Sequence, residues 1–224
     1  MPQQITHSES ALMQSRPILR ARERQTYEHF LKRAIDLFGS SVLLCLLSPV
    51  FLFLALLVSI SDGLPVFYSR RVVGCRGEFN AYKFRTMLRN ADAILAADPE
   101  LRDAFTRDFK LKSDPRVTRV GAWLRKYSLD ELPQLFNVVR GQMSLVGPRM
   151  ITAEELSKYG EYQELLISVK PGLTGYWQVR GRQDVSYEHR VQMDVHYITQ
   201  WSLGLDLMIL FETPLRVIRG EGAY

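Results

Sequence analysis

The chain has 224 residues, a formal net charge of +5 and only two cysteines. This length suffices for one compact domain beside a membrane segment but not comfortably for two, and two cysteines exclude a disulfide framework. The positive charge indicates an anionic partner, which composition alone leaves open between nucleic acid, an anionic lipid surface and a phosphorylated substrate. Residues 1–26 are polar and rich in Gln, Ser and Arg, so we expect a mobile basic arm.

A helical pattern begins at Tyr27 and leads into the apolar residues 42–60, VLLCLLSPVFLFLALLVSI, which are numerous enough to cross a bilayer. Ser48 and Pro49 interrupt this run, because proline removes a helical N–H and the serine can bond the carbonyl that is left free. Basic residues flank both sides, so the positive-inside rule places both flanks in the cytoplasm. We therefore predict that residues 27–62 form a re-entrant membrane helix, with a kinked spanning helix as the alternative.

Residues 63–224 are predicted to form one cytoplasmic catalytic domain of a mainly helical α/β class. Residues 66–68 and 78–85 read as two short strands around a Gly74/Gly77 turn, which predicts a β-hairpin. Helical patterns follow at residues 86–110, 121–126, 129–139 and 152–169. Residues 201–217 include both apolar and charged side chains around Pro214. We therefore expect an amphipathic segment that lies in the plane of the membrane.

Acidic residues follow Ser128 at the start of the predicted helix 129–139. Ser128 and Glu131 have the spacing of a capping box, and Asp130 would then lie in the first turn, where the helix dipole favours negative charge. Adjacent carboxylates in an Arg-rich chain also suit Mg²⁺, which takes one or two carboxylates and completes its shell with phosphate oxygens and water. From these residues alone, a structural cap and a metal site formed by Asp130 and Glu131 are both open.

Four motifs, in order along the chain, carry a family resemblance: KFRTM at 83–87, DPRVTRVGAWLRK at 114–126, SLDELPQLFNVVRGQMSLVGPR at 128–149 and KPGLTGYWQVRGR at 170–182. Together they resemble the bacterial sugar transferases of the monotopic polyprenyl-phosphate phosphoglycosyl transferase family. The resemblance covers nearly everything from Tyr27 to Tyr224. It is greatest to the short exopolysaccharide-type members.

The resemblance implies transfer of hexose-1-phosphate from UDP-galactose or UDP-glucose to undecaprenyl phosphate, with release of UMP, at the cytoplasmic face of the bacterial inner membrane. This would be the first membrane step of exopolysaccharide or surface glycan assembly. In the family the Asp of the Asp-Glu pair is the nucleophile and the Glu helps to hold Mg²⁺, which here means Asp130 and Glu131. A covalent aspartyl-phosphosugar avoids direct attack of one polyanion on another.

Basic residues that match family positions are expected to bind phosphate. The family places the Lys of its KFR motif at the active site, which corresponds to Lys83, and Arg125 and Arg149 match phosphate-contacting positions. Arg85 is two residues beyond Lys83, so both would share one strand face. The family usually reads Pro-Arg-Pro where this chain has Arg149 followed by Met150, so the chain direction after Arg149 is set less rigidly.

Residues 171–182 are expected to form the nucleotide and sugar side of the site. Gly175 permits a tight turn near a ligand, and Thr174 and Gln178 can hydrogen-bond a base or ribose. Arg180 and Arg182 can meet phosphate. Tyr176-Trp177 is more often core or membrane-interface packing than a stacking platform. Asp114 and Arg116 recur in the family motif, but Asp114-Pro115-Arg116 is equally a structural turn with a local ion pair, so neither residue is included among the catalytic residues.

Two other functions are compatible with the residues. One is a membrane-anchored module that binds anionic ligands without catalysis, and the other is a glycosyltransferase that would release UDP instead of UMP. The chain shows no recognition helix or RNA-binding aromatic motif, so nucleic acid is not expected as a partner. The identity of the hexose and the oligomeric state, a homodimer included, are left open by the sequence.

Overall fold

A bent pair of helices begins the part of the chain that the computed structural model describes, namely residues 27–108, 111, 113–181 and 186–220. The helix Tyr27–Leu46 and α2 (Ser48–Asp62) meet at 61°. Pro49 has no N–H for the carbonyl of Cys45, and Ser48 Oγ donates to that carbonyl at 2.8 Å instead. The predicted break at Ser48-Pro49 is therefore confirmed, and the helix from Tyr27 runs into the apolar segment as far as Leu46, as expected.

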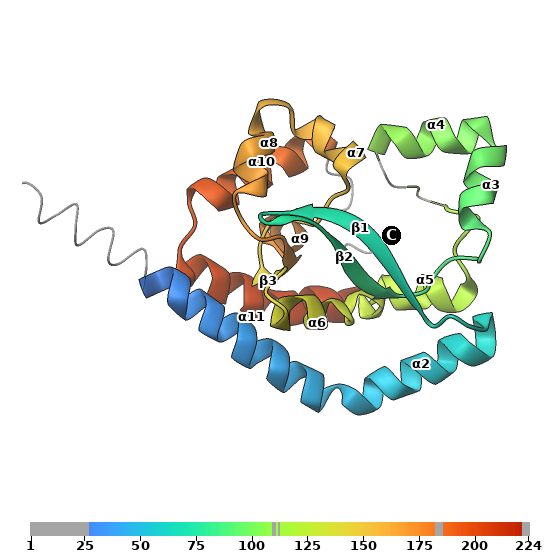
Figure 1. Ribbon diagram of the computed structural model, residues 1–224, viewed down its shortest axis with the longest axis horizontal. Helices are drawn as coiled ribbons and strands as arrows, with labels where there is room; N and C mark the ends of the chain where they lie inside the picture. Colours follow the sequence, from blue (N-terminus) through green and yellow to red (C-terminus); the bar gives the residue numbers. More distant parts are fainter. Residues whose placement is uncertain (1–26, 109–110, 112, 182–185, 221–224) are drawn as a thin grey trace, which may run out of the picture.

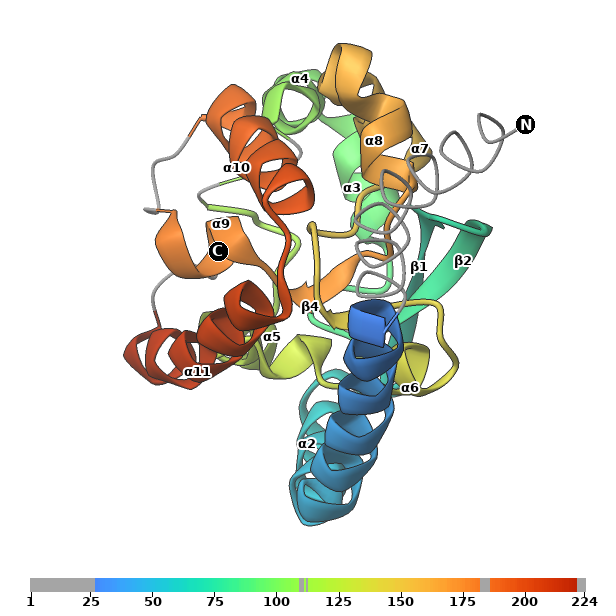
Figure 2. The ribbon, with the colours of Figure 1, turned by 90° about the vertical axis from the view of Figure 1, so that its left-hand side faces the viewer.

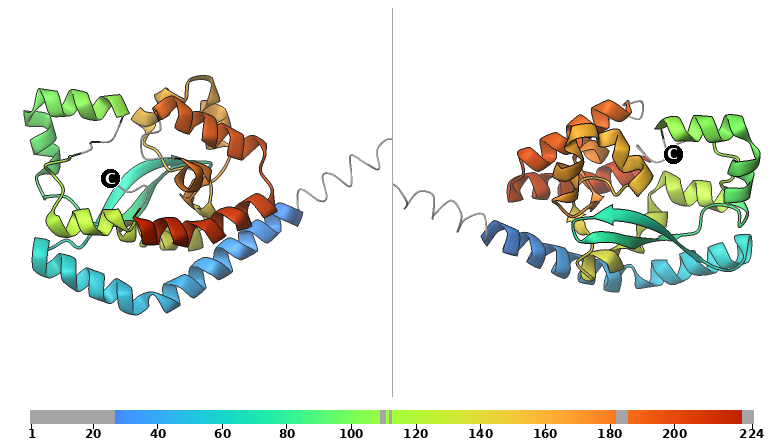
Figure 3. Two further views of the ribbon diagram at one scale, coloured as in Figure 1. Left: turned by 180° about the vertical axis from the view of Figure 1, so that it is seen from behind. Right: turned by 45° about the horizontal axis from the view of Figure 1, so that its top comes forward.

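The bent pair lies along one side of the molecule, and its bend points away from the other elements (Figure 1). Figure 2 shows the pair projecting below the remaining helices, and the two views in Figure 3 agree. Within the described ranges, no single helix has the length and apolar content to cross a bilayer. The two helices of the bent pair have that length and apolar content only when they are taken together.

The predicted β-hairpin is confirmed, with a longer first strand than expected. Strand β1 (Phe67–Gly74) pairs antiparallel with β2 (Gly77–Phe84), from Phe67 opposite Phe84 to Gly74 opposite Gly77. Asn137 fastens the hairpin to the following helices, because its Oδ1 accepts from the Tyr82 N–H at 3.1 Å and its Nδ2 donates to the Asn80 carbonyl at 2.8 Å.

Of the helical stretches predicted after the hairpin, 121–126 is confirmed as a single helix, whereas 86–110, 129–139 and 152–169 are each divided. Asp98 is extended ahead of Pro99, as pre-proline residues tend to be, and this separates the two helices within 86–110. Ser128 adopts a left-handed conformation with φ of 52° and its side chain caps nothing, so the predicted capping box is wrong. A capping box requires an extended N-cap residue, whereas Ser128 reverses the chain here. The elements are α3 (Ala91–Ala97), α4 (Pro99–Asp108), α5 (Arg119–Lys126), the 3-10 turn η1 (Leu129–Glu131) and α6 (Gln134–Val139).

A second, parallel pair of strands was not predicted. Strand β3 (Ser144–Val146) lies beside β4 (Gly172–Thr174). A Cβ on Gly172 would lie 2.1 Å from the Gly147 nitrogen, so this approach requires glycine. The predicted helix 152–169 is broken at Gly160, where φ is 52°. It becomes α7 (Ala153–Leu156), the 3-10 helix η2 (Ser157–Tyr162) and α8 (Gln163–Ile167).

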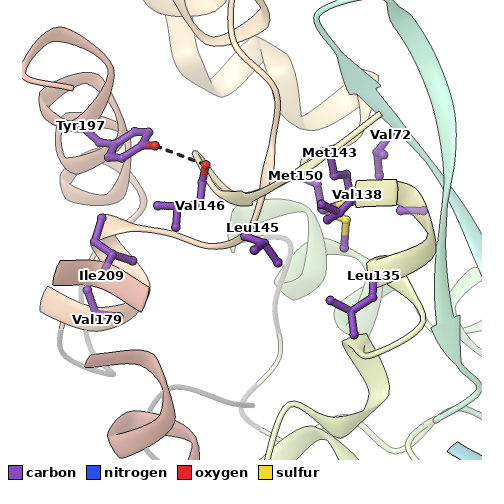
Figure 4. Packing of buried hydrophobic residues seen from close by; sticks show 11 residues of the cluster. Val72, Leu135, Val138, Met143, Leu145, Val146, Met150, Val179, Tyr197 and Ile209 are labelled. Atoms are coloured by element: carbon purple, nitrogen blue, oxygen red, sulfur yellow. Dashed lines mark hydrogen bonds between the residues drawn. The ribbon is translucent and has the colours of Figure 1, made fainter. Parts of the chain in front are cut away.

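Three helices complete the described chain: α9 (Tyr176–Arg180), α10 (Tyr187–Thr199) and α11 (Leu203–Arg219). Pro214 lies inside α11 without ending it. The main core lies among the hairpin, α6, β3 and α11, as Figure 4 shows, and the Tyr197 hydroxyl lies 3.3 Å from the Val146 carbonyl oxygen within it. This core holds β3 rigidly just before Arg149. Its buried members are Val72, Ala81, Leu135, Val138, Met143, Leu145, Val146, Met150, Val179, Tyr197 and Ile209.

Candidate active site

Two neighbouring carboxylates lie on η1, between α5 and α6, and face cations from other elements. Lys83 of β2 has its Nζ 2.6 Å from Glu131 Oε1 and 3.9 Å from Asp130 Oδ2. Arg149, which follows β3, has its Nη2 3.7 Å from Glu131 Oε1. Arg125 of α5 adds a third positive charge that acts on both carboxylates. The fold thus gathers Lys83, Arg125 and Arg149 around the Asp130/Glu131 pair.

The two carboxylates differ in electrostatic state. Asp130 is only 5% exposed, and burial together with the neighbouring Glu131 charge raises its pKa against the opposing effect of the cations. Burial alone would also raise the pKa of Glu131, but the charges of Lys83 and Arg149 and the Lys83 hydrogen bond outweigh it and lower that pKa to about 2. Glu131 is therefore held ionised, while Asp130 is a buried carboxylate with less compensation.

Arg85 does not join this cluster. Its Nη2 donates to the carbonyls of Asp62 at 2.6 Å and Gly63 at 2.5 Å, at the C-terminal end of α2. A cation at a helix C-terminus is favoured by the free carbonyls and the helix dipole. The strand alternation that placed Arg85 beside Lys83 ends with β2 at Phe84, and the side-chain hydrogen bonds of Arg85 run to the end of α2 instead of to the carboxylates.

Arg149 is held firmly although no proline follows it. Its backbone forms a bridge with Gly172, the first residue of β4, and the Gly172 N–H donates to the Pro148 carbonyl at 2.8 Å. Met150 is 9% exposed and belongs to the main core. Packing and strand pairing thus set the chain direction that Pro-Arg-Pro sets in the family pattern. The guanidinium carbon of Arg149 lies 5.7 Å from the centre of the Trp177 ring.

The residues predicted for the nucleotide and sugar side have mixed positions. Thr174 Oγ1 lies 2.9 Å from Thr213 Oγ1, and Arg180 donates to Glu212 at 2.6 Å, so both contact α11 instead of the carboxylates. Gly175 is the N-cap of α9, and Gln178 Oε1 is buried without a hydrogen-bond partner among the described residues. Arg182 lies outside the described residues.

A group of residues beside Arg149 was missed by the sequence reasoning. Trp177, interpreted as core packing, is indeed 8% exposed, but it contacts Arg149 and also Arg190 of α10, whose guanidinium carbon is 5.2 Å from the ring centre. Asp194 is 1% exposed and accepts from the Tyr159 hydroxyl at 2.8 Å. The only signal was the i, i+4 spacing of Arg190 and Asp194 on one helix face.

The Asp114-Pro115-Arg116 turn is confirmed as structural. Arg116 donates from Nε to Asp114 Oδ1 at 2.8 Å and from Nη2 to Asp114 Oδ2 at 2.7 Å. Burial opposes the ionised form of Asp114, but these hydrogen bonds lower its pKa overall. Both side chains are therefore occupied with each other.

The carboxylates of Asp130 and Glu131 are also potential metal ligands. Among the described residues, no group of three or more His, Cys, Asp and Glu side chains could hold a metal ion. Asp130 and Glu131 supply two carboxylates, a set that fits Mg²⁺ when phosphate oxygens and water complete the shell. The donor chemistry thus suits an ion that arrives with a phosphorylated ligand.

Known proteins match most of the chain. The family described as bacterial sugar transferase matches residues 27–220. The chain is 48% identical over 200 residues to the undecaprenyl-phosphate galactose phosphotransferase of Salmonella typhimurium strain LT2, covering 87% of this chain but 42% of that protein. It is 46% identical over 198 residues to the exopolysaccharide production protein ExoY of Rhizobium meliloti, covering 86% and 88%.

A further relative is the undecaprenyl-phosphate glucose phosphotransferase of Komagataeibacter xylinus, 36% identical over 225 residues, with 92% of this chain and 39% of that protein covered. The chain thus spans less than half the length of the two relatives named as phosphotransferases and most of the length of ExoY. The motifs that predicted the family include the residues now seen around the carboxylate pair. The chain belongs to the bacterial sugar transferase family.

Proposed function

We propose that this chain transfers hexose-1-phosphate from UDP-galactose or UDP-glucose to undecaprenyl phosphate and releases UMP. The observation that carries the proposal is the buried Asp130/Glu131 pair within reach of three cations, Lys83, Arg125 and Arg149. The excess of positive charge suits a diphosphate, and Asp130 is available as a nucleophile. The names of the relatives, which include galactose and glucose phosphotransferases, support the choice of sugar and of lipid acceptor.

The reaction would take place in two displacements on phosphorus. A carboxylate oxygen of Asp130 bonds to the sugar-bearing phosphorus of the UDP-hexose, and the P–O bond to the nucleotide phosphate breaks, so that UMP leaves with the electron pair. A phosphate oxygen of undecaprenyl phosphate then bonds to the same phosphorus. The Asp130 carboxylate is released unchanged, and the product is the lipid diphosphate-linked hexose.

The neighbouring residues have separable roles in this scheme. Lys83 keeps Glu131 ionised, and Arg149 and Arg125 offset negative charge on the phosphates. Asp130 and Glu131 would hold Mg²⁺, which would neutralise charge on the departing phosphate when bound. Asp130 has to be ionised to attack phosphorus. Burial raises its pKa, and the charges of Lys83, Arg125 and Arg149 oppose that rise and so favour the reactive carboxylate.

Exposed apolar faces support a monotopic position on the cytoplasmic side of the inner membrane. The bent helix pair exposes large side chains on both arms, for example Phe38 at 74% and Ile60 at 84%. Helix α11 adds a stripe at helical spacing, Leu207, Phe211, Leu215 and Ile218, of which Phe211 is 80% exposed. A re-entrant pair and an in-plane helix would together hold the carboxylates at the level of a lipid phosphate.

The test is UMP release from UDP-galactose and UDP-glucose by the full chain in nanodiscs, with undecaprenyl phosphate and Mg²⁺. We expect release by wild type, sugar label on the protein when the acceptor is omitted, and neither with Asp130→Asn. Asp103→Asn, an exposed aspartate on α4, is the matched control and should behave as wild type. UDP as the product would indicate transfer of sugar without phosphate. Equal ligand binding by wild type and Asp130→Asn, without turnover by either, would indicate a binding module.

A further inference from the structure

Two arginines from different elements contact one indole beside the carboxylate pair. The guanidinium carbon of Arg149 lies 5.7 Å from the Trp177 ring centre, and that of Arg190 lies 5.2 Å from it. Arg149 also reaches Glu131, at 3.7 Å. Stacking on an aromatic face holds a guanidinium in place while leaving its in-plane N–H groups free for an anion. Trp177 therefore links the carboxylate site to a second cation on α10.

Arg190 has a charge that none of the described carboxylates neutralises in an ion pair. Within the described part of the chain, no carboxylate lies within ion-pair distance of it, and its Nε is buried without a hydrogen-bond partner. One turn further along α10, Asp194 Oδ1 is also buried without a hydrogen-bond partner among the described residues, although the Arg149 backbone interacts with this carboxylate and Oδ2 accepts from Tyr159. Buried donors and acceptors are seldom left unpaired unless a water or ligand completes them. An always-charged guanidinium in this position points to an anionic ligand.

We propose that Arg190 is a further donor-binding residue, which together with Arg149 grips the diphosphate of the nucleotide sugar across Trp177. This inference rests on the proposed function. Arg149 is the nearer of the two to the carboxylates, so it faces the phosphate that carries the sugar and is attacked by Asp130. Arg190 is the second cation in contact with the indole, and it binds the phosphate that leaves with the nucleotide. Its planar guanidinium can donate to two phosphate oxygens there.

The variants Arg190→Gln and Arg190→Lys test this role, with Arg102→Gln, an exposed arginine on α4, as the control for charge. The readouts are KM for the UDP-hexose, KM for undecaprenyl phosphate, inhibition by UMP, and the shift in unfolding temperature that UMP produces. For Arg190→Gln we expect the donor KM to rise about 10- to 100-fold, as for a lost hydrogen bond to a charged group. Inhibition and stabilisation by UMP should weaken in parallel.

The acceptor KM of Arg190→Gln should stay within about twofold of wild type, because the lipid phosphate does not use the nucleotide end of the site. The donor KM of Arg190→Lys should lie between those of wild type and Arg190→Gln, since lysine keeps the positive charge but not the planar fork of N–H donors. Unchanged donor KM and UMP inhibition in Arg190→Gln, with active wild type, would overturn this inference alone. So would equal weakening for donor and acceptor with a lower unfolding temperature. No UMP release by wild type would overturn the proposed function and this inference with it.

Discussion

Two buried lysine–carboxylate clusters in this molecule differ in how fully their hydrogen bonds are met. In the first, Lys32 of the helix Tyr27–Leu46 donates to Asp206 Oδ2 at 2.5 Å and to the Val146 carbonyl at 2.9 Å. The hydroxyl of Tyr197 donates to Asp206 Oδ1 at 2.7 Å, and Trp201 Nε1 donates to Oδ2 at 3.1 Å. Both oxygens of this carboxylate are occupied, and the cluster joins the helix Tyr27–Leu46 to α11 and β3.

The second cluster, Lys83 with Asp130 and Glu131, has the same residue types but a different balance. Glu131 accepts the close contact from Lys83, whereas Asp130 is 3.9 Å from it and buried. Three cations face the two carboxylates, so positive charge is left for a ligand. A satisfied buried ion pair acts as structural support, whereas a carboxylate with a raised pKa among surplus cations is suited to chemistry. Substitutions in the two clusters should therefore separate stability from activity.

The largest expected effect is that of Asp130→Asn on turnover. Loss of the proposed nucleophile should lower transfer by at least about 10³-fold. The unfolding temperature should be unchanged or higher at neutral pH, because the raised pKa of Asp130 means that burial disfavours its charge. Initial rates of UMP release and thermal unfolding of the same preparation measure both effects. A fall in stability together with activity would contradict the distinction between the clusters.

Asp206→Asn should produce the opposite result. Removing one partner of a buried ion pair costs about 3 kcal/mol of unfolding free energy. Chemical denaturation measures the loss, and the remaining folded protein should keep a normal donor KM. Lys32→Met combined with Asp206→Asn should lose less than the two separate losses added, because the pair is coupled. Glu78→Gln, which breaks the exposed contact with Arg71, is the control and should cost less than about 1 kcal/mol.

Lys83→Met should change the pH profile as well as the rate. Lys83 is the main opponent of burial in setting the Glu131 pKa at about 2, so its removal lets that pKa rise. We expect turnover to fall about 100-fold at neutral pH and the acid limb of the pH–rate profile to move to higher pH. Lys158→Met, on an exposed lysine, should leave the limb in place. An unmoved limb in Lys83→Met would show that Lys83 does not control the ionisation of the site.

Asp194 offers a smaller, purely electrostatic test. Burial raises its pKa to about 7, so the folded protein holds a proton there that the unfolded chain has lost. Stability from this group is complete below pH about 4 and is lost as pH rises through about 7. Between pH 6 and pH 8, wild type should lose about 1 kcal/mol more than Asp194→Asn. Denaturation of both proteins at each pH cancels the contribution of histidines, and parallel curves would refute the prediction.

The smallest expected effect concerns the bend between the helix Tyr27–Leu46, which contains Lys32, and α2. Pro49→Ala restores the N–H that the Cys45 carbonyl lacks, so the helix should straighten toward a span in part of the population. Cysteines added at each terminus of a variant without Cys45 and Cys75 report which side of the membrane each end occupies. Both termini still on the cytoplasmic side in Pro49→Ala would contradict a bend set by proline. Among the described residues, no hydrogen bond or ion pair joins Pro49 to the Lys83, Asp130 and Glu131 cluster.

Local chemistry accounts for what could be predicted correctly. Proline geometry requires the break after Leu47, glycine spacing and alternation indicate the hairpin, and the motifs point to Lys83, Arg125, Asp130, Glu131 and Arg149. These features follow from residues close in the chain or from a pattern shared with a family. The capping box failed because Ser128, between α5 and η1, has the right side chain but a left-handed backbone conformation, which leaves its side chain without a capping hydrogen bond.

Contacts between distant residues were decided only by the tertiary structure. Arg85 and Lys83 are both cations two positions apart, yet one contacts α2 and the other Glu131. Nothing in the sequence pairs β3 with β4, or brings Arg190 to the indole that Arg149 contacts. The residue type determines which hydrogen bonds a side chain can donate or accept. Which partner it bonds depends on which surfaces the fold brings together.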